Sequence, residues 1–138
     1  METYVQMKQR HQEEFNTLPK FSAFTEEQFE KGKAELGIKG DSDVYSLGSG
    51  VFFRKADKPL FDDQFKRQYQ ERETAMKDFD FCVGMFLNEL ANHEYIVTGD
   101  AEEAIKACGL HPDEVNKDNH LNKAFATARK QYLKAYGE

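Results

Sequence analysis

Aromatic side chains recur every three or four residues along one stretch of this sequence, 59–77. Phe61, Phe65 and Tyr69 follow one another at a spacing of four, and Met76 continues the series. Residues three and four apart lie on the same face of an α-helix, so this spacing predicts a helix. A helix of this kind has to bury its apolar face against another element, which constrains the chain to a fold of packed helices.

The aromatic residues also make up for a low apolar content. Only 39% of the 138 residues are hydrophobic, but they include 12 Phe and 6 Tyr. Each buried aromatic side chain removes about 150–250 Å² from water. A chain of this length can bury one core without disulfides or metals. We therefore predict a Phe-rich core and a single domain over residues 1–138.

Helix signals dominate the rest of the chain. Thr25 and Gln28 form a capping box at a helix start, and Gly37 stands where a left-handed residue commonly ends a helix. The predicted helices cover 3–17, 25–36, 59–77, 79–92, 100–108, a single turn near 110–114, and 119–136.

Two short β-like segments, 44–47 and 51–54, flank Gly48-Ser49-Gly50. This pattern predicts a β-hairpin with a three-residue loop. The loop does not match the glycine-rich patterns that bind phosphate, and a turn already explains its glycines. A further β-like run is predicted at 95–98. The expected fold is therefore α+β, with mainly short amphipathic helices around a Phe-rich core and one small β-hairpin.

The two cysteines, Cys82 and Cys108, both fall in apolar helical patterns. This placement is typical of reduced thiols in a core. The N-terminus has no apolar signal core, and no run approaches 18 apolar residues. We expect a cytoplasmic protein that does not enter a membrane.

Charge is distributed unevenly along the chain. Residues 1–77 carry a net charge of −1, residues 78–118 carry ten acidic and two basic side chains, and residues 119–138 carry a net charge of +3. The acidic middle block argues against nucleic-acid binding there, because phosphate contacts require Lys and Arg. It favours a surface that faces a basic protein. The alternative is a solvated acidic face that only keeps the protein soluble.

A second hypothesis is a nucleic-acid-linked accessory or regulatory protein. Residues 100–136 are predicted as a helix, a turn, a short helix and a longer helix, which is the order of a helix-turn-helix. Contacts to nucleic acid would come from basic residues of the last helix. These residues are Lys123, Arg129, Lys130 and Lys134.

A third hypothesis is a small enzyme of unknown reaction. His11 and Glu14 share a helix face, and a fold that brought His93 beside them would create a site. The chain has no nucleophile-elbow, CxxC, HExxH or kinase pattern. We therefore expect no catalytic residue, no metal site and no cofactor.

Several stretches carry a resemblance that covers nearly the whole chain. They are 7–14, 23–29, 45–50 with 54–55, 92–95 with 98–100, and 109–110 with 113–115. In these stretches the sequence resembles a largely uncharacterised family of small proteins encoded by phages, plasmids and integrative elements of gut and related bacteria.

This resemblance implies an anti-defence protein of a mobile element, in particular an anti-CRISPR. Anti-CRISPR proteins of this size and charge include inhibitors of type II RNA-guided nucleases, whose nucleic-acid channel is strongly basic. The expected mechanism is stoichiometric binding of such a basic partner through an acidic surface. The expected contact residues are Asp78, Asp80, Glu89, Glu94, Asp100, Glu102 and Glu103.

Overall fold

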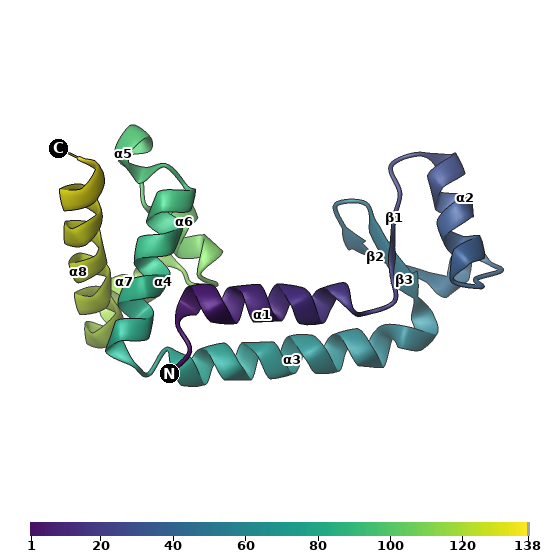
Figure 1. The fold of residues 1–138 in the computed structure, drawn as a ribbon, viewed down its shortest axis with the longest axis horizontal. Coiled ribbons are helices and arrows are strands. Elements are labelled where there is room, and N and C mark those ends of the chain that lie inside the picture. Colours follow the sequence, from purple (N-terminus) through teal and green to yellow (C-terminus); the bar gives the residue numbers. More distant parts are fainter. Residues whose placement is uncertain (138) are drawn as a thin grey trace. The chain divides into compact units, whose positions relative to one another are not determined.

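The computed structural model describes residues 1–137 and is built mainly from α-helices, with one small sheet (Figure 1). The helices are α1 (Tyr4–Asn16), α2 (Glu26–Glu35), α3 (Lys58–Ala75), α4 (Phe79–Asn92), α5 (Tyr95–Thr98), α6 (Glu102–Ala107), α7 (Pro112–Lys117) and α8 (Asn119–Tyr136). The strands are β1 (Phe21–Ser22), β2 (Val44–Gly48) and β3 (Val51–Arg54), and two short 3-10 helices are η1 (Asp41–Asp43) and η2 (Lys55–Asp57). The predicted α+β fold is confirmed.

The chain folds as two compact units. The first, which we call the helical unit, comprises residues 1–10 and 71–138, and the second, the sheet unit, comprises residues 11–70. The boundaries fall inside α1 and α3, so each of these helices contributes residues to both units. The prediction of a single domain stays a prediction.

The sheet has three antiparallel strands in the order β1-β3-β2. Gly48 pairs with Val51, which leaves Ser49 and Gly50 as a two-residue turn. Both turn residues have positive φ, 54° and 77°, a geometry that matches the twist of a hairpin. The predicted hairpin is confirmed with a shorter loop, and β1 adds a third strand to it.

Phenylalanine rings form the core of the sheet unit. Phe21 stacks on Phe52 with ring centroids 5.5 Å apart, and Phe53 stacks on Phe61 at 4.1 Å. Phe21 also lies against α2 at Gly32, where an added Cβ would be 2.1 Å from the ring. The predicted Phe-rich core is therefore present, and it relies on a glycine to let the ring approach the helix backbone.

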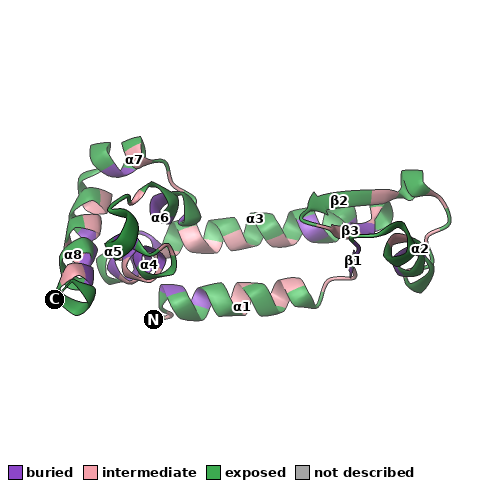
Figure 2. Ribbon diagram, turned by 90° about the horizontal axis from the view of Figure 1, so that it is seen from above, coloured by how far each residue is buried: buried purple, intermediate pink, exposed green. Residues whose placement is uncertain are grey.

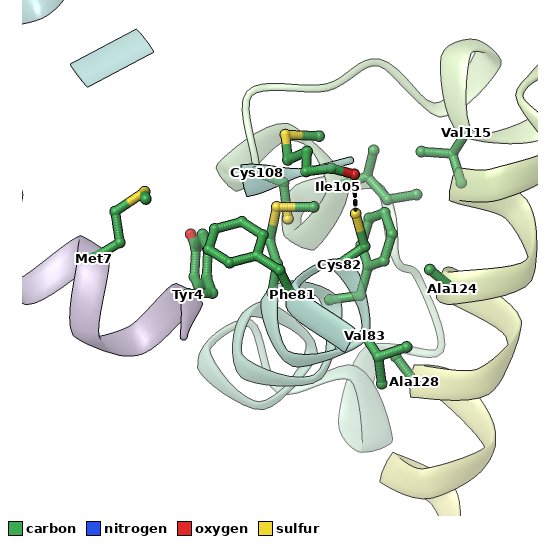
Figure 3. Close-up of a cluster of buried hydrophobic side chains, with 13 residues drawn as sticks. Tyr4, Met7, Phe81, Cys82, Val83, Ile105, Cys108, Val115, Ala124 and Ala128 are labelled. Atoms are coloured by element: carbon green, nitrogen blue, oxygen red, sulfur yellow. Dashed lines mark hydrogen bonds between the residues drawn. The ribbon is translucent and has the colours of Figure 1, made fainter. Parts of the chain in front are cut away.

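The central element of the helical unit is α4. Its buried residues are Phe81, Cys82, Val83, Met85, Phe86, Glu89 and Leu90. They pack against α6, α8 and the start of α1, where Tyr4 and Met7 are buried (Figures 2 and 3). Because α4 has neighbours on several sides, its buried residues occupy more of its circumference than the single apolar face of a surface helix.

Helices α4 and α8 pack against each other and run in the same direction. Two ring pairs join them, Phe79 with His120 and Phe86 with Phe125, and Tyr95, just after α4, contacts Tyr132 further along α8. The residue numbers rise together along both partners. After α4 ends, the chain must therefore run back to the level at which α8 begins. Residues 93–118, which contain α5, α6 and α7, make this return (Figure 1).

A short helix, α5, replaces the β-like run predicted for this segment, and that prediction is wrong. Glu94 and Gly99, on either side of α5, both have left-handed φ, 50° and 67°. Tyr95 is buried against Tyr132, whose hydroxyl accepts a hydrogen bond from the Ile96 amide at 3.0 Å. The contact with α8 thus determines the conformation of a run too short to define it alone.

Candidate functional site: an acidic surface on the helical unit

The seven carboxylates predicted as contact residues all belong to the helical unit, but their exposure differs. Exposed are Asp80, Glu94, Asp100, Glu102 and Glu103, while Asp78 is half-buried and Glu89 is buried. Asp80 and Glu94 stand near opposite ends of α4, about 20 Å apart along its axis at roughly 1.5 Å per residue. The predicted set is therefore divided between the two ends of this helix.

Asp78 and Asp80 lie at the N-terminal end of α4. Asp78 is the N-cap, and its carboxylate accepts a hydrogen bond from the Phe81 amide at 2.9 Å. A carboxylate at this position also interacts favourably with the helix dipole. Together with Glu2 and Tyr4, the two aspartates line a shallow hollow of about 370 Å³. Asp78 therefore has a structural role in starting α4.

Glu89 is buried, and its prediction as a surface contact residue is wrong. Its side chain is 2% exposed and accepts hydrogen bonds from the Tyr4 hydroxyl at 2.7 Å, Asn92 Nδ2 at 2.8 Å and Lys8 Nζ at 3.2 Å. Burial raises the pKa of Glu89, but these hydrogen bonds outweigh burial and hold its pKa below the ordinary value. Glu89 is thus an ionised, paired carboxylate that fastens the start of α1 to α4.

The exposed carboxylates concentrate on the segment that returns from α4 to α8. Residues 94–118 carry seven acidic and two basic side chains, and we call the exposed carboxylates of this segment together the acidic surface. Its acidic residues, all exposed, are Glu94, Asp100, Glu102, Glu103, Asp113, Glu114 and Asp118. Lys106 pairs with Glu102 at 2.9 Å, and among residues 1–137 no lysine or arginine pairs with the other six. The negative charge of this surface therefore remains largely uncompensated.

Some of these carboxylates also hold the backbone of the acidic surface. In the capping box that starts α7, Glu114 accepts a hydrogen bond from the His111 amide at 3.0 Å, while His111 Nδ1 accepts one from the Asp113 amide at 3.1 Å. Ahead of α6, Asp100 Oδ1 accepts a hydrogen bond from the Glu102 amide at 2.9 Å. These bonds satisfy amides that short helices leave unpaired, and they fix the positions of the charges.

A hollow of about 330 Å³ interrupts the acidic surface between α6, α7 and α8. Its lining includes the buried side chains of Ile105 and Val115 and the half-buried ring of Phe125. Asp100 and Glu102, both exposed, also line it. The hollow thus combines an apolar floor with an acidic rim.

Cys82 and His120 lie close together, but they are not arranged for nucleophilic catalysis. The Cys82 thiol donates a hydrogen bond to the Met76 carbonyl oxygen at 3.0 Å (Figure 3), and His120 Nε2 lies 2.9 Å from the same oxygen. His120 Nε2 must carry a hydrogen to bond this carbonyl, so it cannot take the thiol proton. Burial, followed by the charges of Asp78 and Asp118, raises the pKa of Cys82 to about 11. Both cysteines are free and buried, as predicted.

The four basic residues of the nucleic-acid hypothesis all lie on α8, on two different faces. Lys123, Lys130 and Lys134 are spaced seven and four residues apart, which places them on one face. All three are exposed, and none has an ion pair within residues 1–137. We call them the lysine stripe. Arg129 is separate from it, because its Nε donates a hydrogen bond to the Tyr95 hydroxyl at 2.8 Å.

The residues of the enzyme hypothesis belong to different units. His11 and Glu14 are one turn apart on α1, in the sheet unit, where Glu14 accepts a hydrogen bond from Gln68 at 3.0 Å and pairs with Arg67 at 3.1 Å. His93 ends α4 in the helical unit as its C-cap. Glu14 therefore already has partners within its own unit. The prediction that these three residues form one site stays a prediction.

Comparison with known proteins assigns the chain to a family. The model of a family of unknown function, DUF7659, matches residues 3–131, so the chain belongs to this family. No curated protein and no solved structure matches the chain. Among residues 1–137, no helix has both the length and the hydropathy needed to cross a membrane.

Proposed function

We propose that this protein acts by binding a positively charged protein through its acidic surface. The observation that carries the proposal is the exposed, largely unpaired negative charge of residues 94–118, where seven acidic side chains face two lysines. Such a surface attracts a basic partner over a distance and speeds association. The hollow between α6, α7 and α8 adds apolar area, which a stable interface requires beside charge.

The narrower proposal names the partner and the effect. On the resemblance of the sequence to proteins of mobile elements, we propose that the partner is a type II RNA-guided nuclease and that binding inhibits it. The basic channel of such a nuclease holds an RNA–DNA heteroduplex through its backbone. An acidic surface competes for the same positive charges, and its affinity should fall as salt screens them.

The test compares two triple variants of equal charge change. The first reverses three carboxylates of the acidic surface, Glu94→Lys, Asp100→Lys and Glu103→Lys. The control reverses three exposed carboxylates elsewhere, Glu35→Lys, Asp63→Lys and Glu73→Lys. Binding to the purified nuclease is followed by surface plasmon resonance, and inhibition by cleavage of a plasmid target.

We expect the first variant to bind at least ten times more weakly, mainly through slower association, and the control to stay within about threefold of the wild type. Equal losses in both variants would show that only net charge matters and would remove the acidic surface as the contact. Absence of both binding and inhibition at molar excess of the wild-type protein would remove the nuclease as partner.

A second candidate function, nucleic-acid binding, is favoured by the lysine stripe. Lys123, Lys130 and Lys134 share an exposed face of α8, and residues 119–136 include no acidic side chain. Three phosphate contacts predict a slope of about −2.7 for the logarithm of the binding constant against the logarithm of salt concentration on duplex DNA. The triple Lys→Gln variant should abolish retardation in a gel-shift series, and absence of retardation by the wild type at low salt would exclude this function.

A further inference from the structure

We propose that the hollow between α6, α7 and α8 receives an arginine side chain of the partner protein. This inference rests on the proposed function and names the contact that anchors it. A hollow of about 330 Å³ is at the small end of binding pockets in proteins, so it suits one or two side chains better than a whole secondary-structure element. Arginine is also among the residues that most often dominate binding energy in interfaces.

The floor of the hollow suits the apolar part of an arginine. Ile105 and Val115, both buried, present aliphatic surface to it, and the half-buried ring of Phe125 lines it as well. The methylene stem of arginine packs readily on such surface while its charged end stays near water. The planar guanidinium also stacks on aromatic faces, which gives Phe125 a direct role.

The rim of the hollow suits the charged end. Asp100 uses its Oδ1 atom to accept the Glu102 amide at 2.9 Å, while Oδ2 has no hydrogen bond or ion pair among residues 1–137. Oδ2 can therefore accept from a guanidinium without breaking a bond within the fold. Glu102 pairs with Lys106, but both side chains are 51% exposed, and an incoming cation can displace so open a pair.

The experiment titrates the isolated protein with a small probe, N-acetyl-arginine methylamide, and follows the methyl signals of Ile105 and Val115 by nuclear magnetic resonance. The neutral citrulline analogue has nearly the same shape and serves as the control probe. The test variant is Asp100→Asn, whose amide oxygen can still accept the Glu102 amide, so the turn before α6 is retained. The matched control variant is Asp80→Asn, which removes another exposed charge, at the start of α4.

We expect saturable shifts at Ile105 and Val115 with the arginine probe, at least fivefold weaker binding for Asp100→Asn, and less than twofold change for Asp80→Asn. Shifts no larger than those of the exposed methyls of Val5, or equal shifts with the citrulline probe, would overturn the inference.

The titration needs no partner protein, so its outcome is separate from that of the proposed function. Arginine binding in the hollow without nuclease binding would leave this inference intact and remove the nuclease. Nuclease binding that depends on the acidic surface, without arginine-induced shifts at Ile105 and Val115, would support the proposed function and remove the arginine contact in the hollow.

Discussion

The buried network around Glu89 makes a quantitative prediction through the variant Tyr4→Phe. The Tyr4 hydroxyl donates to Glu89 at 2.7 Å, and both side chains are buried, at 7% and 2% exposure. A hydrogen bond to a charged group contributes about 1.5–3 kcal/mol to stability. Lys8 and Asn92 remain bonded to the carboxylate in the variant, so Glu89 keeps other donors. We therefore expect the free energy of unfolding at pH 7 to fall by about 1.5–3 kcal/mol.

The assay is urea denaturation followed by circular dichroism. The matched control is Tyr136→Phe, which removes a hydroxyl from a side chain that is 57% exposed and should change the free energy of unfolding by less than about 0.5 kcal/mol. Equal effects of the two variants would refute the buried hydrogen bond to Glu89.

The same network predicts a pH dependence with a definite sign. The pKa of Glu89 is lower in the folded protein than its ordinary value. A depressed pKa contributes stability above the unfolded-state value, about 4.3, and this stability is lost as pH falls through the folded-state pKa. The difference between wild type and Tyr4→Phe should therefore shrink as the pH falls below the unfolded-state value and through the lower folded-state pKa of Glu89. A difference that grows as the pH falls would contradict a lowered pKa for Glu89.

Two further predictions concern packing in each unit. Gly32→Ala should lower the free energy of unfolding by about 1–3 kcal/mol, because the new Cβ would lie 2.1 Å from the ring of Phe21. Gly84→Ala has no atom within 4 Å of the new Cβ and should raise the free energy of unfolding by about 0.5–1 kcal/mol, because alanine favours a helix over glycine. Thermal unfolding measures both variants, and melting temperatures that shift in the same direction would contradict the described contacts of these two glycines. Burial raises the pKa of the Cys82 thiol to about 11 and that of the Cys108 thiol to about 12. At pH 8 a thiol reagent should therefore label Cys82 roughly 100 times and Cys108 roughly 1,000 times more slowly in the folded protein than in the urea-unfolded chain. Rapid labelling of the folded protein would show that the helical unit opens.

The sequence predicts most of the helices because their signals are local. The N-cap Thr25 accepts a hydrogen bond from the backbone amide of Gln28, which is one half of the predicted capping box, while the Gln28 side chain accepts from the Phe24 amide. Gly37 has the left-handed φ expected after a helix. Periodicity alone does not show which positions are buried. In α3, Phe61 is 1% exposed, while Phe65 and Tyr69 at the same spacing are 41% and 55% exposed. Burial depends on neighbours that are distant in sequence, so no local pattern contains it.

The candidate site is predicted less well, for the same reason. The charge of residues 94–118 follows directly from the sequence, and so does the exposure of short helices that carry many carboxylates. Glu89 is the exception, because a formal charge does not by itself make a side chain exposed. One feature of the sequence does indicate its burial: Glu89 stands three residues after Phe86 and next to Leu90, within the most apolar run of the chain. Its partners Tyr4 and Lys8 are more than 80 positions away, and only the fold identifies them.

The shared direction of α4 and α8 has a consequence for how this protein can change. Two helices that point the same way cannot be joined by a tight turn, so residues 93–118 must span the length of the pair on its outside. The side chains of this span that reach the core are Tyr95, Ala104, Ile105, Cys108 and Val115. His93 and Asp118 at its ends are the caps of α4 and α8, and most of its other side chains are exposed. The exposed positions of this segment can therefore change with little effect on the packing of α4 against α8.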